Sequence, residues 1–202
     1  LGSGDQQLPL NEVMRSGGVL DALDRIRAEG LTDFIGFTAL GDASACCAVV
    51  ESGRIDTAQV YYNLINPSAG FDIEGHWYSD NYTGLLKACQ QFNVGVLGIR
   101  VYAAGILASR VQHGREIPVT RNSDYDSELK RADMVREVLA EMDWSDAQKA
   151  LRFVLDQDAI HGAVIGLAEL SHLHEAVQAT QMDSLSRSVT EVLKDLWSRD
   201  YR

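Results

Sequence analysis

The feature that most constrains the fold of this chain is the alternation of short apolar runs with longer amphipathic segments. Four apolar runs of strand length occupy residues 33–39, 57–64, 94–102 and 162–167. The third run is apolar almost throughout, which is typical of a strand in a parallel sheet with both faces covered. Segments of helical periodicity separate the runs, as they do in right-handed β-α-β units. We therefore predict an α/β fold whose four strands lie parallel and adjacent, in sequence order.

The intervening segments place apolar residues three and four positions apart, the spacing of a helix with one buried face. This spacing predicts helices over 10–29, 41–52, 82–92, 127–142, 145–156, 169–179 and 184–199. Ser145 and Gln148 form a capping-box pattern at the start of one of them. A long polar loop, 103–126, follows the third strand. No linker or low-complexity segment interrupts the pattern, so we expect residues 1–202 to form a single domain.

The charge balance excludes several classes of partner. The 202 residues include 29 Asp and Glu against 18 Lys and Arg, a formal net charge of −11. An acidic surface repels the phosphates of nucleic acids and of anionic membranes, so we expect neither as a partner. No apolar run is long enough for a transmembrane helix, and the opening residues LGSGDQQLPL lack the pattern of a secretory signal.

Cysteine usage indicates a reducing compartment, and cysteine and histidine usage together predict no metal site in the protein. Cys46, Cys47 and Cys89 are an odd number of cysteines and cannot form a complete set of disulfides. We therefore predict reduced thiols and a cytoplasmic location. The histidines do not combine with these cysteines at the spacing of a zinc site, so we expect no bound metal.

Two parallel α/β architectures compete for this pattern. A doubly wound sheet that binds a dinucleotide carries G-x-G-x-x-G directly after its first strand. The turn after residues 33–39 reads ALGDASACC and lacks these glycines. Four β-α units are half of a (β/α)8 barrel, whose usual size is about 250 residues. We therefore predict a parallel fold of the TIM-barrel type, with half of the barrel present in this chain.

The four strand segments, taken in order, resemble strands five to eight of the aldo-keto reductase family. The stretch GGVLDALDRIRAEGLTDFIGFTALGD resembles the helix and fifth strand of that family, and TAQVYYNLIN resembles its sixth strand. VGVLGIRVYAAGILA resembles the seventh strand, and ALRFVLDQDAIHGAVIGLAELSHLHEAVQA resembles the helix, eighth strand and terminal turn. The motifs keep the family's order across residues 17–179. The resemblance implies that the chain is the second, C-terminal half of a (β/α)8 barrel.

The resemblance also implies an oxidoreductase that binds a nicotinamide cofactor, NAD or NADP. The family transfers hydride reversibly between this cofactor and a small carbonyl, alcohol or sugar substrate. Its catalytic Tyr, Lys, Asp and His lie on the first half of the barrel, upstream of the matched segments. We therefore expect no catalytic residue in this chain and no reductase activity from the chain alone. A preceding N-terminal half of a longer protein, which we favour, or a second copy in a homodimer then completes the barrel.

Cofactor contacts are implied at the ends of three strands. Thr38 and Gln59 occupy the positions that hold the nicotinamide carboxamide in the family. An unpaired buried amide costs about 1–3 kcal/mol, so Gln59 needs a partner, and a hydrogen bond to a neighbouring strand is the alternative to a ligand. Ile99 replaces the aromatic residue that stacks on the nicotinamide, and Arg100 is placed to pair with the pyrophosphate or with a surface carboxylate. Gly105 matches a family glycine, as in a tight turn.

The adenosine end of the cofactor is implied at the last strand. We expect this strand to end at Gly166, so that Gly166 and Leu167 lie beside the N-terminus of helix 169–179, which offers an anion site. His172 takes the position at which the family often has an Arg for the 2′-phosphate, and Glu175 takes that of an adenine contact. The segment GLAELSHLHEA contains no Arg or Lys. We therefore expect a weaker preference for NADP over NAD than the family usually shows.

A second class of function stays open, a binding or regulatory protein that kept the barrel and lost hydride transfer. Ala39, Ile99 and Ala176 replace residues that contact the cofactor in the family, and these replacements favour this alternative. An Asp, a Tyr and a Lys on strand-like segments encoded upstream of Leu1 would favour the enzyme instead.

Overall fold

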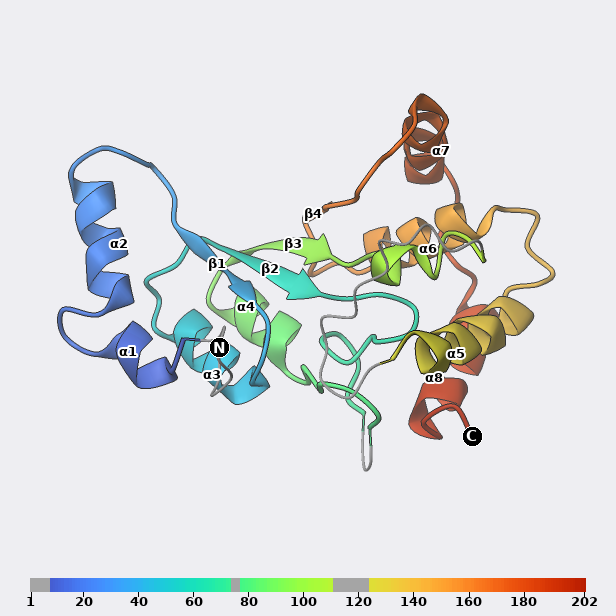
Figure 1. Ribbon diagram of the computed structural model, residues 1–202, viewed down its shortest axis with the longest axis horizontal. Coiled ribbons are helices and arrows are strands. Elements are labelled where there is room, and N and C mark those ends of the chain that lie inside the picture. The colour runs from blue at the N-terminus through green and yellow to red at the C-terminus, as the bar shows by residue number, and fades with distance from the viewer. Residues whose placement is uncertain (1–7, 74–76, 111–123) are drawn as a thin grey trace.

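Four parallel strands form the sheet in the part of the chain that the structure describes. The structure is a computed structural model, and it describes residues 8–73, 77–110 and 124–202. The strands are β1 (Gly36–Ala39), β2 (Thr57–Tyr61), β3 (Gly95–Ile99) and β4 (Gly162–Ala163). They lie in the order β1-β2-β3-β4, and each neighbouring pair is parallel (Figure 1). The predicted strand order and strand direction are therefore confirmed.

Helices precede the first strand, connect the strands and follow the last one. They are α1 (Leu10–Met14), α2 (Val19–Ala28), α3 (Ala43–Glu51), α4 (Leu85–Gln91), the 3-10 turn η1 (Ala103–Gly105), α5 (Tyr125–Val138), α6 (Asp146–Leu155), α7 (Leu170–Thr180) and α8 (Arg187–Ser198). The capping box of α6 is confirmed, because Ser145 Oγ accepts from Gln148 N at 3.1 Å and Gln148 Oε1 accepts from Ser145 N at 3.0 Å. The single helix predicted over 10–29 is wrong. α1 ends at Met14 because Arg15 is extended, with a ψ of 157°, and Gly17 takes a φ of +72° in the turn that leads to α2.

The strands are shorter than the apolar runs that predicted them. The strand predicted over 162–167 differs most from the structure, since β4 ends at Ala163 and not at Gly166. β4 pairs with β3 alone, and no strand lies along its other edge in the described residues. A strand with one neighbour loses its ladder as soon as it diverges from that neighbour. Residues 111–123 of the predicted loop 103–126 lie outside the described part of the chain.

The two faces of the sheet differ in what covers them. On one face Ala58, Val60 and Val96 are buried, and α4 packs against β2 and β3 from this side, with α3 beside it (Figure 1). On the other face Thr38 and Leu97 are exposed. Parallel sheets normally bury both faces. The described residues therefore leave one face of this sheet open, and we call it the open face.

Gly98 on β3 allows α6 to pack closely against the covered face. A Cβ atom at Gly98 would lie 2.9 Å from Val154 Cγ1 and 3.3 Å from Ile160 Cγ2. We expect Gly98→Ala to lower the free energy of unfolding by about 1–3 kcal/mol, the usual effect of overpacking a core. Gly95→Ala on the same strand is the control, because its Cβ lies no closer than 3.5 Å to a neighbouring atom. Chemical denaturation measures both variants, and equal losses would contradict this packing.

The C-terminal segment holds the loop that follows β2. Trp197 Nε1 on α8 donates to the carbonyl of Leu64 at 3.0 Å. Tyr201 Oη donates to the carbonyl of Ile65 at 2.9 Å, and Tyr78 Oη donates to the same carbonyl at 2.7 Å. Three aromatic donors therefore fix two successive peptide groups at the carboxyl end of the sheet. We call this arrangement the aromatic clamp.

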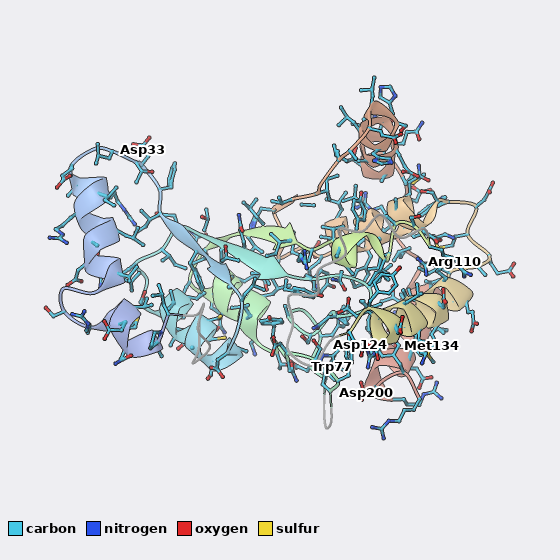
Figure 2. The ribbon with its side chains drawn as sticks, in the orientation of Figure 1. Asp33, Trp77, Arg110, Asp124, Met134 and Asp200 are labelled. Atoms are coloured by element: carbon cyan, nitrogen blue, oxygen red, sulfur yellow. The ribbon has the colours of Figure 1, made fainter. Side chains whose placement is uncertain are left out.

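A cation and a further aromatic ring pack against Tyr78 of the aromatic clamp. Arg131 on α5 stacks over the Tyr78 ring at 3.4 Å from its centroid, a cation–π contact. The Trp77 and Tyr78 ring centroids are 4.8 Å apart. Tyr78 N donates to Asp200 Oδ1 at 3.3 Å, and Figure 2 shows Trp77 and Asp200 close together beside the chain end. Helix α5, the loop after β2 and the C-terminal segment are thereby tied together.

Candidate functional site

A row of residues in register crosses the open face. Thr38 on β1, Gln59 on β2 and Leu97 on β3 are paired, and Gly162 continues the row on β4. Thr38 and Leu97 are exposed, and Gln59 is half-buried. Thr38 is the penultimate residue of β1, Gln59 and Leu97 are the middle residues of β2 and β3, and Gly162 is the first residue of β4. The carboxyl ends of the strands, where parallel α/β folds place their functional sites, lie one or two residues further along each strand.

Thr38 and Gln59 contact each other directly. Thr38 Oγ1 donates to Gln59 Oε1 at 3.1 Å, which is the hydrogen bond to a neighbouring strand that the sequence left open as an alternative. Within the described ranges, no hydrogen bond takes up the amide N–H groups of Gln59. The pair therefore presents two N–H donors and the lone pairs of a hydroxyl to the open face. This is a set that suits a small amide or carbonyl group.

Ile99 and Arg100 lie where β3 ends. Ile99 is paired with Tyr61, so its half-buried side chain shares a face with Gln59. Arg100 follows as the first residue after the strand and is half-buried. The structure therefore places one apolar and one cationic residue at the edge beside the Thr38–Gln59 pair.

The turn after β3 has an unusual backbone. Arg100, Ala103 and Ala104 have φ values of 61°, 45° and 59°, in the left-handed region that side chains disfavour. Gly105 continues at 103°, and the tight turn predicted there is present as η1. Strain of this kind persists where the surrounding structure holds it, and it gathers at ligand sites.

Gly166, Leu167 and His172 are all exposed and lie beyond the sheet. Gly166 and Leu167 belong to the segment between β4 and α7, and His172 lies on the first turn of α7. The strands β2 and β3 separate this region from β1. The structure therefore does not place these three residues beside Thr38.

Glu175, unlike His172, lies near the turn that follows β3. It is half-buried on α7, and its carboxylate acts on the Tyr102 phenol in the turn after β3. Burial first, and this carboxylate second, raise the pKa of Tyr102 to about 12. Helix α7 begins after Glu169, whose side chain makes no capping hydrogen bond. The first N–H groups of α7 therefore remain without a side-chain cap.

Asn63 and Asn66 are two buried polar residues to which the sequence interpretation gave no role. They are 0% and 1% exposed. Asn63 Nδ2 donates to the carbonyl of Arg100 at 2.9 Å. Asn63 Oδ1 accepts from the N–H groups of Ile65 and Asn66 at 3.0 and 2.9 Å. The signal in the sequence is the run NLINPS directly after a strand, because Asn and Ser bind nearby backbone in turns.

Tyr61 at the end of β2 is buried near this turn. Burial first, and then the Glu128 carboxylate, raise the pKa of Tyr61 to about 12. A phenol that works as a general acid near neutral pH needs a pKa shifted toward 7 instead. The surroundings of Tyr61 therefore oppose acid catalysis by this residue.

The thiols and potential metal ligands add no chemistry to the site. Cys46, Cys47 and Cys89 are free, and burial raises the pKa of Cys46 to about 12 and that of Cys89 to about 11. Such thiols stay protonated and unreactive at neutral pH. Among the described residues, no group of three or more His, Cys, Asp or Glu side chains is placed to hold a metal ion. Nor does any helix in those ranges have the length and hydropathy to cross a membrane.

Comparison with known proteins gives a family and a fold. Residues 4–198 match the aldo/keto reductase family. The holo form of an aldo-keto reductase from Bacillus halodurans aligns with a TM-score of 0.66 at 16% identity, covering 92% of this chain and 59% of that protein. Its apo form gives 0.62 at 18% identity, covering 98% and 62%. An aldo-keto reductase from Klebsiella pneumoniae in complex with NADPH gives 0.60 at 21% identity, covering 95% and 55%. A comparison with curated protein sequences gives no match.

The family match extends past the motifs found in the sequence at both ends. It covers residues 4–198, whereas the motifs run from 17 to 179. The chain spans 55–62% of the length of the solved structures it matches, and their 16–21% identity shows the fold alone. The chain belongs to the aldo/keto reductase family.

Proposed function

We propose that this chain supplies the cofactor-binding half of an oxidoreductase barrel, strands five to eight of a (β/α)8 fold. The observation that carries the proposal is the open face with its Thr38–Gln59 pair. A sheet closed into a barrel turns one face inward and covers the other with helices. The covered and open faces of this sheet have that division, so in a completed barrel the open face is the interior. Residues 1–202 then act as one unit of the barrel.

Exposed apolar side chains at the two edges of the sheet support the same proposal. Beside β1, Leu31 and Phe34 are 72% and 71% exposed. Beside β4, Leu167 and Leu170 are 43% and 67% exposed. Figure 1 shows α2 beyond the β1 edge and α7 beyond the β4 edge. Grouped apolar residues mark surfaces that another element covers. We assign that cover to the first half of the barrel on the same protein rather than to a second copy, since the related structures carry further length in one chain.

A nicotinamide cofactor fits the residues of the open face. Its carboxamide carries one carbonyl acceptor, which matches the Gln59 N–H groups, and one amide donor, which matches the Thr38 oxygen. Ile99 contacts the nicotinamide ring, and Arg100 pairs with the pyrophosphate as a planar cation. Gly105 ends the left-handed turn beside them with a φ of 103°. A cofactor bound there supplies hydride to a carbonyl substrate, or accepts it from an alcohol or sugar.

The adenosine end of the cofactor is assigned to α7. Gly166 and Leu167 lead into this helix, whose uncapped N–H groups suit a phosphate. His172 and Glu175 then lie along the adenosine. The catalytic acid comes from outside these 202 residues, so the chain alone reduces no aldehyde. The three free thiols support a reducing compartment, the cytoplasm.

A binding or regulatory protein on the same barrel is the second candidate. Ile99 favours it, because an aliphatic side chain cannot stack on the nicotinamide as a ring does. Ala39 does not favour the regulator, because its side chain is 0% exposed and lies on the covered face, away from the proposed site. Spectrophotometric turnover of NADPH with a panel of aldehydes separates the two candidates in the full-length protein. Cofactor binding without turnover on any member favours the regulator.

We expect the full-length protein to bind both NADPH and NADH, with dissociation constants that differ by less than a hundredfold (about 2.7 kcal/mol). The 2′-phosphate that distinguishes them is an anion that needs fixed positive charge. His172 stands where the family often has an Arg and lacks the planar guanidinium, and Glu169 and Glu175 repel the phosphate. Fluorescence titration of both cofactors measures the ratio. Binding of neither contradicts the proposed function, whereas a larger preference for NADPH contradicts only the argument from His172.

A further inference from the structure

We propose that Asn63 is a positioning residue, which holds Arg100 in place for the cofactor pyrophosphate. This inference rests on the proposed function. Asn63 follows β2 and Arg100 follows β3, at neighbouring strand ends. Asn63 is 0% exposed, and its Nδ2 donates to the Arg100 carbonyl at 2.9 Å. A fully buried side chain thus connects the two strand ends at the edge of the proposed site.

The orientation of the Asn63 amide is fixed by its surroundings. Its Oδ1 accepts from the N–H groups of Ile65 and Asn66 at 3.0 and 2.9 Å. Two backbone donors on this side leave the oxygen as the only amide atom that fits there, so Nδ2 must face Arg100. The carbonyls of Leu64 and Ile65 are themselves held by the aromatic clamp. The donor that reaches Arg100 therefore stands on a rigid loop.

Arg100 needs such support because of its backbone conformation. Its φ is 61°, a left-handed value that side chains disfavour. Its carbonyl accepts from Ala103 N at 2.8 Å as well as from Asn63. Because φ and ψ set the direction in which a side chain leaves the backbone, these two hydrogen bonds aim the guanidinium. Arg100 also lies close enough for its charge to act on the Tyr61 phenol beside the same turn.

An aimed guanidinium binds an anion more tightly than one that must be ordered on binding. When Nδ2 is lost, Arg100 is free to leave the left-handed region, and its side chain direction changes with it. The charge of Arg100 remains in the protein but no longer meets the pyrophosphate in a fixed geometry. Asn63 therefore affects cofactor binding through Arg100 and has no contact with the cofactor.

The test measures NADPH affinity of the full-length protein over a range of salt concentrations. Asn63→Asp keeps both oxygen contacts and replaces the donor with an oxygen that repels the Arg100 carbonyl. We expect Asn63→Asp and Arg100→Leu each to raise the dissociation constant about tenfold, and the double variant to be no weaker than either single variant. Both single variants should also show a flatter salt dependence, because each removes the same ion pair.

Asn66→Asp is the matched control. Asn66 is 1% exposed in the same loop, and its Nδ2 donates to the carbonyl of Asp80 at 3.0 Å instead of to Arg100. We expect this variant to lose stability while its salt dependence stays that of the unchanged protein. If Asn66→Asp flattens the salt dependence as Asn63→Asp does, the role of Asn63 is structural and the inference is overturned. The inference is also overturned if Asn63→Asp binds NADPH as tightly as the unchanged protein while Arg100→Leu binds it more weakly.

Two further arms keep the outcome clear. If Asn63→Asp does not fold, Asn63→Leu removes the donor without adding a charge or another donor, Asn66→Leu is its control, and the same expectations apply. Inorganic pyrophosphate is titrated in parallel with NADPH. Pyrophosphate binding that depends on Asn63 and Arg100, in a protein that binds no NADPH, supports the positioning role and overturns the proposed function. If the protein binds neither NADPH nor pyrophosphate, both the positioning role and the proposed function are overturned.

Discussion

Replacing Trp197 with Ala is expected to lower the free energy of unfolding by about 3–5 kcal/mol, the usual effect of removing a buried Trp. Trp197 is 2% exposed, and its ring centroid lies 5.1 Å from that of Phe71 and 5.6 Å from that of Phe153. Its Nε1 also donates to the carbonyl of Leu64 at 3.0 Å. The variant thus opens a cavity and leaves a buried carbonyl with one donor fewer, and these two effects add.

Guanidinium or urea denaturation measures this loss, with Val192→Ala as the control on the same helix. Val192 is 52% exposed, so its truncation should change the free energy of unfolding by less than about 0.5 kcal/mol. Trp197→Phe keeps most of the ring packing and should lose less than Trp197→Ala. A Trp197→Ala variant as stable as Val192→Ala would show that α8 does not pack under the loop after β2.

Sequence periodicity predicted the sheet well because parallel strands and their helices have distinct patterns. The run at 94–102 is apolar almost throughout, which is typical of a strand in a parallel sheet, and β3 forms within it. Periodicity failed where the outcome depends on neighbours or on one residue. The helix predicted over 10–29 breaks at Arg15, which is extended with a ψ of 157°, and the last strand stops at Ala163, where its pairing with β3 ends. A helical or apolar pattern does not contain the residue at which the backbone turns or at which two strands diverge.

The same division applies to the candidate site. Gln59 was recognisable because a polar amide interrupts an apolar strand, and its partner Thr38 lies opposite it in register. Asn63 was missed because its importance comes from a contact with Arg100, which is 37 positions away in the chain. The open face was not foreseen either, since a run of apolar residues predicts cover on both sides. The structure shows it through Thr38 and Leu97, which are exposed beside buried strand neighbours.

Loss of the Gln59 amide donors is expected to weaken NADPH binding by about ten- to hundredfold, as expected for two hydrogen bonds to a ligand. Gln59→Glu keeps the oxygen that accepts from Thr38 at 3.1 Å and removes both N–H groups. The new carboxylate then faces the carboxamide oxygen and repels it. The sheet itself should be little affected, because Gln59 is half-buried and takes part in the strand pairing through its backbone.

The dissociation constant of NADPH for the full-length protein, compared between Gln59→Glu and Thr57→Val, tests the central claim most directly. Thr57 lies on the same strand and the same face, two positions toward the amino end, where no cofactor contact is assigned. The proposed site predicts a dissociation constant at least about tenfold higher for Gln59→Glu, and one within about twofold of the unchanged protein for Thr57→Val. Equal affinity of Gln59→Glu and the unchanged protein would contradict the claim that the open face holds the nicotinamide.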